Sequence, residues 1–253
     1  MGLVALLALM AGCATNPGAT SYKAPGSGEN PRTEAARVNT ELGQKYLSQG
    51  KFELALEKLQ RALANDPRYV DAHTVIAVLY ESIGNDKLAE EHYRRATQLK
   101  PNAGDENNNY GRFLCKTGRY SESTPYFQRA VADPFYKTPS VAMTNAGTCA
   151  LKGGNLEVAE QQLRAALDRD PDSGVALFQM ANTLYQKQDF FRARAFMQRF
   201  EARGENNAES LMLARNIELR LGNSTTAQEY TKRLRRDFPE SEQARALDVQ
   251  STP

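Results

Sequence analysis

The sequence predicts an all-α protein, a solenoid of six helix-pair repeats, each about 34 residues long. The first observation is the spacing of prolines, because Pro67 and Pro101 are 34 residues apart. Pro171 and Pro239 are 68 residues apart, which is two such periods. The second observation is that small residues recur at fixed places between these prolines, and the third is a turn signal, usually Gly, within most periods. One helix pair cannot bury its own apolar face, so stacked neighbours must share a continuous core.

Six repeats follow from this register. They span residues 36–69, 70–103, 104–137, 140–173, 174–207 and 208–241. In the second repeat, Ala77 and Ala89 take positions where two helices approach closely, and Tyr93 fills the space beside them. This pattern resembles the tetratricopeptide repeat (TPR). The resemblance implies a right-handed superhelical solenoid that acts as a binding scaffold for other proteins.

Helix ends are also marked in the sequence. Glycine after the first helix of a repeat supplies the left-handed conformation that ends a helix. Proline after the second helix prevents the helix from continuing. Residues 242–253 have no partner repeat, so we expect them to form a frayed C-terminal tail.

The N-terminus carries a targeting signal. Residues 1–12, MGLVALLALMAG, are uncharged and too short to span a bilayer, which takes about 20 residues. They fit the hydrophobic stretch of a secretory signal peptide. The small residues before Cys13 resemble the bacterial lipobox, which implies that Cys13 is lipidated and becomes the new N-terminus. The alternative for Cys13 is a buried or incidental thiol.

The segment after the signal, residues 13–35, is rich in Gly, Pro, Ser, Thr and Asn, and we expect a flexible tether. Burial of acyl chains is worth roughly 0.8 kcal/mol per methylene, so a lipidated Cys13 anchors the chain without a transmembrane helix. In the lipoproteins that the motif resembles, a residue such as Ala14 implies sorting to the outer membrane. The expected location is therefore the outer membrane, lipid-anchored and facing the periplasm.

Composition and motifs argue against nucleic-acid binding, metal binding and catalysis. There are 32 Lys and Arg against 30 Asp and Glu, a formal net charge of +2, which gives no broad reason to bind nucleic acid. No metal-ligand, nucleophile-elbow or phosphate-binding motif occurs, and His73 and His92 are expected to be surface or packing residues. We expect no enzyme activity, no cofactor, no metal and no small-molecule substrate.

Some TPR arrays grip a carboxylate with basic and amide side chains on their concave helices. The corresponding positions in the first three repeats lack cations; they are Thr40, Gln44, Val75, Asp105 and Asn109. The sequence therefore does not predict that clamp.

Two cysteines remain after Cys13. Cys115 and Cys149 lie late in the first helices of the third and fourth repeats, which are neighbours in a solenoid. In an oxidising periplasm such a pair predicts a disulfide. Two separate buried thiols are the alternative, because sequence cannot show that the Cβ atoms come within about 4.5 Å.

Two segments carry a more specific resemblance. The segment from Asn107 to Tyr120, NNNYGRFLCKTGRY, resembles the signature of the type IV pilus biogenesis and stability lipoproteins, the PilW/PilF family. The segment from Asn145 to Leu151, NAGTCAL, resembles a second marked segment of that family. The resemblance implies a pilotin, which helps the outer-membrane secretin reach the membrane and form multimers. It also allows a role in stabilising assembled pili.

The repeat register nominates residues for partner binding on the concave face. They are Thr40, Gln44, Leu47, Thr74, Val78, Asn108 and Arg112. For Asn108 and Arg112 the alternative is internal hydrogen bonding or helix capping. We expect a monomer that binds the secretin of the type IV pilus. The competing hypotheses are another periplasmic TPR adaptor, an outer-membrane assembly factor or an activator of an envelope enzyme.

Overall fold

The computed structural model describes residues 30–249, which form thirteen α-helices and no β-strand. The helices are α1 (Pro31–Ser48), α2 (Phe52–Asn65), α3 (Val70–Ser82), α4 (Asp86–Leu99), α5 (Gly104–Lys116), α6 (Tyr120–Ala132), α7 (Pro139–Lys152), α8 (Leu156–Arg169), α9 (Gly174–Gln186), α10 (Phe190–Glu201), α11 (Ala208–Arg220), α12 (Ser224–Asp237) and α13 (Glu242–Val249). Each odd-numbered helix from α1 to α11 packs chiefly on the even-numbered helix that follows it. The predicted all-α TPR solenoid is confirmed.

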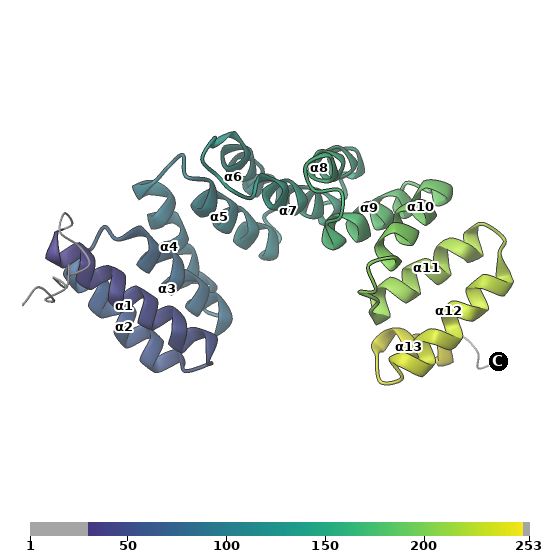
Figure 1. Cartoon of the computed structure of the whole chain (residues 1–253), viewed down its shortest axis with the longest axis horizontal. Helices are drawn as coiled ribbons and strands as arrows, with labels where there is room; N and C mark the ends of the chain where they lie inside the picture. The colour runs from purple at the N-terminus through teal and green to yellow at the C-terminus, as the bar shows by residue number, and fades with distance from the viewer. Residues whose placement is uncertain (1–29, 250–253) are drawn as a thin grey trace, which may run out of the picture.

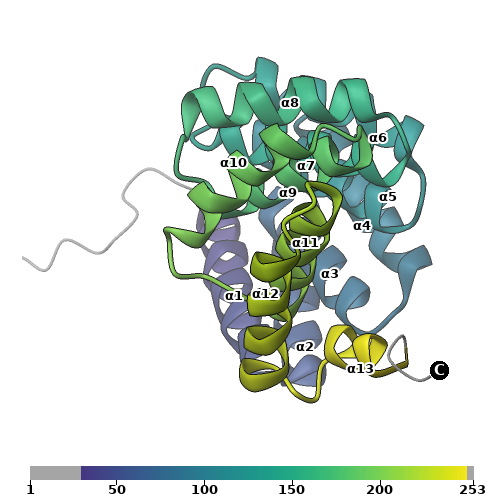
Figure 2. The same cartoon turned by 90° about the vertical axis from the view of Figure 1, so that its right-hand side faces the viewer.

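The helix pairs stack into an open arch, with α1 and α2 at one end and α11 to α13 at the other (Figure 1). In its central part, α5, α7 and α9 lie on the inner side of the arch, and α6 and α8 lie on the outer side. Figure 2 views the arch from its C-terminal end, with α12 and α13 in front and α8 across the top. The first helices of the repeats therefore supply the concave surface.

Glycine at the centre of a first helix lets the second helix approach closely. A Cβ on Gly43 would lie 2.6 Å from Cγ of Leu59. A Cβ on Gly147 would likewise lie 2.6 Å from Cγ of Leu163. Both leucines are fully buried. The small residue and the large one are thus complementary halves of the contact within a repeat.

The turn inside most repeats is closed by a glycine with positive φ. These residues are Gly50 (φ 71°), Gly84 (75°), Gly118 (81°), Gly154 (76°) and Gly222 (80°). In the fifth repeat the same turn uses Gln188, with φ 63°. A side chain is disfavoured in this left-handed region, so the fifth repeat holds a strained turn.

The predicted tether, residues 13–35, is wrong at its C-terminal end because α1 already begins at Pro31. The side-chain oxygen of Asn30 accepts a hydrogen bond from the backbone N–H of Arg32 (3.0 Å). Proline at the first helical position and an acidic residue in the first turn, Glu34, also favour a helix start. The Asn and Pro that suggested flexibility are therefore start signals of α1.

The predicted frayed tail, residues 242–253, is also wrong over most of its length. Its first residues form α13, in which Ala244 and Leu247 are buried. They pack with Leu211 and Leu234 of the last repeat. Apolar residues three apart make one helical face, which covers the open end of the core as a cap. The last four residues lie outside the described part of the chain.

Three N-terminal predictions cannot be compared with the structure. The signal peptide at residues 1–12, lipidation at Cys13 and most of the tether lie outside the described residues. Among the residues that the structure does describe, none of the helices has the length and apolar character needed to cross a membrane.

Candidate functional site

The inner face of the arch carries a polar cluster where α5 lies beside α7. The side-chain amide of Asn145 on α7 donates a hydrogen bond to Oδ1 of Asn108 on α5 (2.9 Å). Asn108 is only 8% exposed, so internal hydrogen bonding, the alternative for this residue, describes it better than direct partner contact. The two amides join the third repeat to the fourth.

Arg112, one turn further along α5, is held by a buried acid of the preceding repeat. Its guanidinium donates to both carboxylate oxygens of Glu81, at 3.1 and 3.0 Å. Tyr93 donates to the same carboxylate (2.7 Å), and so does Lys116 (3.1 Å). Burial of Glu81 disfavours its charge, but these hydrogen bonds outweigh burial and lower its pKa. Glu81 is therefore an ionised anchor that fixes the orientation of Arg112.

A hollow of about 230 Å³ opens between α5 and α7, and α6 closes its floor. Its basic lining consists of Arg112, Lys116 and Lys152. The lining is completed by Cys115, Phe127, Asn145 and Thr148. Lys152 is exposed and has no charged partner among the described residues. The hollow thus combines a cationic rim with a partly apolar floor.

The two cysteines meet beside this hollow. Cys115 and Cys149 are joined as a disulfide, with Cα atoms 5.6 Å apart, and both are buried. Their sequence separation is 34 residues. Equivalent residues of these two repeats, such as Gly118 and Gly154, are further apart in sequence, so the bridge links neighbouring first helices at positions that are not equivalent. Cys149 also lines a second hollow of about 460 Å³ on the other side, among apolar and glutamine side chains of α6, α7 and α8. The bridge and Phe127 separate the two hollows.

The predicted partner-binding residues of the first repeat differ in their exposure to solvent. Thr40 is 4% exposed, and its hydroxyl donates to the carbonyl of Ala36 (2.8 Å), so the prediction that it contacts a partner is wrong. The reason is that the second repeat covers this side of α1. Gln44 is exposed. Leu47 is half-buried against the core of the first two repeats.

The predicted residues of the second repeat lie in its packing layer. Thr74 is half-buried, and its hydroxyl has no hydrogen-bond partner among the described residues. Val78 is half-buried against the aromatic cluster that includes Tyr93 and Phe113. Of the seven nominated residues, Asn108 and Arg112 on α5 are the two that take part in the polar contacts described above.

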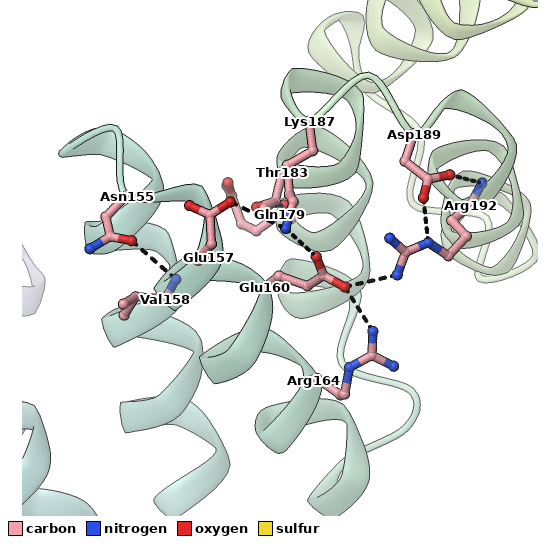
Figure 3. Close-up of polar contacts among 10 residues, drawn as sticks. All are labelled: Asn155, Glu157, Val158, Glu160, Arg164, Gln179, Thr183, Lys187, Asp189 and Arg192. Atoms are coloured by element: carbon pink, nitrogen blue, oxygen red, sulfur yellow. Dashed lines mark hydrogen bonds and ion pairs between the residues drawn. The ribbon is translucent and has the colours of Figure 1, made fainter.

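A second charged cluster joins the fourth and fifth repeats (Figure 3). Glu160 on α8 accepts hydrogen bonds from Lys187, Arg192 and Arg164, each at 2.8 Å. These contacts lower the pKa of Glu160 to about 2. The hydrogen bond from Lys187 makes the largest contribution, and together with the bonds from the two arginines it outweighs the opposing effect of partial burial. Lys187 and Arg192 flank the turn of the fifth repeat. The cluster is therefore a polar contact between repeats.

The two histidines, far apart in sequence, also meet. Their Nδ1 atoms are 3.0 Å apart, and Nε2 of His73 lies 3.1 Å from the carbonyl of Pro67. If the Nε2–H of His73 donates to Pro67, its Nδ1 accepts from His92. Burial lowers the pKa of both imidazoles, which favours this neutral arrangement. Within residues 30–249 no group of three or more side chains could hold a metal ion.

Four polar residues that line the hollow are not among those nominated from the sequence: Lys116, Asn145, Thr148 and Lys152. Lys116 and Lys152 were overlooked because a basic residue at the end of a helix is ordinary. A signal was present, since these lysines are the last residues of α5 and α7, which are equivalent helices of successive repeats. Asn145 lies in a segment that carried the family resemblance, but its register did not place it at a nominated position.

Known proteins resemble this chain in sequence and in structure. A family model described as tetratricopeptide repeat matches residues 40–104 and 144–208. The chain is 31% identical over 240 residues to the type IV pilus assembly protein PilF of Pseudomonas aeruginosa, and the match covers 94% of each chain.

Solved structures agree with this similarity. The crystal structure of PilW, a widely conserved type IV pilus biogenesis factor, matches with a TM-score of 0.80 and 33% identity, over 84% of this chain and 97% of that one. The structure of Pseudomonas aeruginosa PilF matches with a TM-score of 0.78 and 29% identity, over 88% of this chain and all of that one. The chain therefore belongs to the PilF/PilW family of type IV pilus biogenesis proteins, which are built from tetratricopeptide repeats.

Proposed function

We propose that this protein is a pilotin, which brings secretin subunits to the outer membrane and promotes their assembly into the multimeric channel of the type IV pilus. The observation that carries the proposal is the similarity to a type IV pilus assembly protein over nearly the whole chain. The TPR array and these relatives favour a non-catalytic adaptor, because a solenoid offers an extended binding surface.

Lipidation at Cys13 provides the membrane attachment in this proposal. Acyl chains on Cys13 hold the protein at the outer membrane, and the repeats face the periplasm. Attachment raises the effective concentration of bound secretin subunits at the membrane where they assemble. Loss of the lipid therefore impairs assembly even when the repeats still bind the secretin.

The inner face of the arch is the proposed contact surface. Its rigid helices hold Arg112 and Asn145 in place through Glu81 and Asn108. Side chains that are fixed before binding lose little entropy when a partner docks. A polar cluster held in this way supports recognition of a specific segment of the secretin.

The test compares secretin multimers in outer-membrane fractions by semi-native gel. A deletion strain is complemented with the wild-type gene or with Cys13→Ser. We expect multimers with the wild type, none in the deletion strain, and lost or mislocalised multimers with Cys13→Ser. Intact multimers in the deletion strain combined with loss of surface pili contradict the pilotin proposal and indicate stabilisation of assembled pili.

A further inference from the structure

We propose that the hollow between α5 and α7 binds a carboxylate of the partner protein, so that the docking segment of the partner is acidic. This inference rests on the proposed function and adds the chemistry of the contact. The groups that recognise the carboxylate are Arg112, Lys116, Lys152, Asn145 and Thr148.

The charge balance of the hollow favours an anion. Arg112, Lys116 and Lys152 supply three positive charges, and the buried Glu81 cancels one of them. The C-terminal ends of α5 and α7 together contribute roughly one further negative charge, because a helix end carries about half a charge. A positive excess therefore remains on the rim, and an acidic group of a partner is the complementary charge.

Unused hydrogen-bond donors also converge on the hollow. Lys116 donates one of its three N–H groups to Glu81, and Lys152 makes no hydrogen bond within the described residues. Asn145 uses one amide hydrogen on Asn108 and keeps the other. The Nε–H of Arg112 is not among the bonds to Glu81 and Tyr93. A carboxylate accepts several such bonds at once, and charged donors make them strong.

The size of the hollow suits a single side chain or a chain end of a partner protein. Its volume of about 230 Å³ is below the range of about 300–1,000 Å³ typical of sites for small molecules. Cys115 and Phe127 give the floor an apolar character. The structure thus suits a carboxylate next to an apolar group, such as an acidic residue in an otherwise apolar segment. Because α5 and α7 lie on the inner side of the arch (Figure 1), the segment is expected to run along the concave surface.

This site differs from the TPR carboxylate clamp that the sequence excluded. The clamp positions belong to the first three repeats and include Asp105, which repels an anion. The cations of the present hollow instead come from later positions of α5 and α7. The charge complementarity is therefore found at other positions of the array than those of the clamp.

The experiment measures binding of purified secretin to the full chain, purified in detergent, by biolayer interferometry. Lys152→Glu and Lys116→Glu reverse one charge of the hollow each. Lys87→Glu is the matched control, because Lys87 is an exposed lysine on α4 that lines no part of the hollow. Circular dichroism spectra and melting curves show whether each variant keeps the wild-type fold.

We expect Lys152→Glu and Lys116→Glu to weaken secretin binding roughly three- to tenfold, and Lys87→Glu to leave it unchanged. Wild-type binding should also weaken from about 50 to about 500 mM NaCl, and less so in Lys152→Glu. If the wild type binds the secretin but the hollow variants behave like the control, the carboxylate site is refuted and the pilotin proposal survives. If the wild type does not bind the secretin at all, the pilotin proposal fails and this inference fails with it.

Discussion

Glu160 offers a sharp test of the polar contact between repeats. The substitution Glu160→Gln keeps the size of the side chain but removes its negative charge. Three charge-assisted hydrogen bonds, from Lys187, Arg192 and Arg164, then lose their ionised acceptor. The fourth and fifth repeats lose part of the interaction that joins them (Figure 3).

The expected cost follows from the exposure of the three donors. Arg164 lies one turn away on the same helix and is 55% exposed, so its contribution is about 0.3–0.5 kcal/mol. Arg192 is 48% exposed, so the contribution of its bond is also reduced by solvent screening. Lys187 is 24% exposed and makes the most protected of the three bonds. Together these give a loss of about 1.5–2.5 kcal/mol in the free energy of unfolding.

The matched control is Glu157→Gln on the same helix. Glu157 is 80% exposed and lies 3.6 Å from the same Lys187, so we expect a loss below about 0.5 kcal/mol. Both variants are unfolded by heat at pH 7 and followed by circular dichroism. For a chain of this size, 1 kcal/mol corresponds to roughly 2–4 °C. Equal melting temperatures for Glu160→Gln and the control would refute the reasoning.

The pH dependence gives the same contact an independent readout. The pKa of Glu160 is about 2 in the folded protein, below the ordinary value of 4.5 for a glutamic acid side chain. A lowered folded-state pKa means that the stabilisation is fully present above about pH 4.5 and is lost as the pH falls through about 2. The difference in stability between the wild type and Glu160→Gln should therefore shrink across this window. A difference that stays constant down to pH 2 contradicts the role of the charge.

Three further predictions concern the repeats themselves. Leu163→Ala leaves a cavity against Gly147 in a fully buried site, so the free energy of unfolding measured by chemical denaturation should fall by about 2–5 kcal/mol. A fall below about 1 kcal/mol contradicts the packing. The Cys115–Cys149 bridge closes a loop of one repeat, so its reduction should lower the free energy of unfolding by up to about 4 kcal/mol. If intact mass spectrometry shows that both thiols are alkylated without reductant, the bridge is contradicted. Gln188→Gly should relieve the positive φ of the fifth turn and raise stability by about 0.5–1 kcal/mol in urea unfolding, and a lower midpoint contradicts the strain.

The repeat architecture could be predicted because its signals are local. Gly43 and Gly147 mark where two helices touch, and Gly50 or Gly154 marks where the first helix ends. Each signal lies within one period, so the period alone reveals it. The fold class therefore follows from spacing, without knowledge of any contact between distant residues.

The ends of the array were harder to predict because they interrupt the period. Asn30 and Pro31 look like tether residues by composition, but their order is that of a helix cap followed by the first helical residue. Ala244 and Leu247 belong to no repeat, yet the last repeat exposes an apolar face that needs a cover. At both ends the order of the residues, rather than their composition, decides the structure.

The polar cluster of the inner face was predicted only in part. Arg112 was nominated by its register, but its anchor Glu81 lies 31 residues earlier, in another repeat. Such a pair depends on how two repeats pack, which the periodic pattern does not specify. The same limit applies to the histidines, whose contact brings together residues 19 positions apart.

The most direct measurement for the central claim is site-specific photocrosslinking in cells. A photoreactive amino acid replaces Thr148, which lines the hollow on α7, or Glu157, an exposed residue of the outer helix α8. We predict that the secretin is crosslinked from position 148 and not from position 157. A full-length protein that supports secretin multimers, yet crosslinks the secretin only from position 157, contradicts recognition by the inner face of the arch.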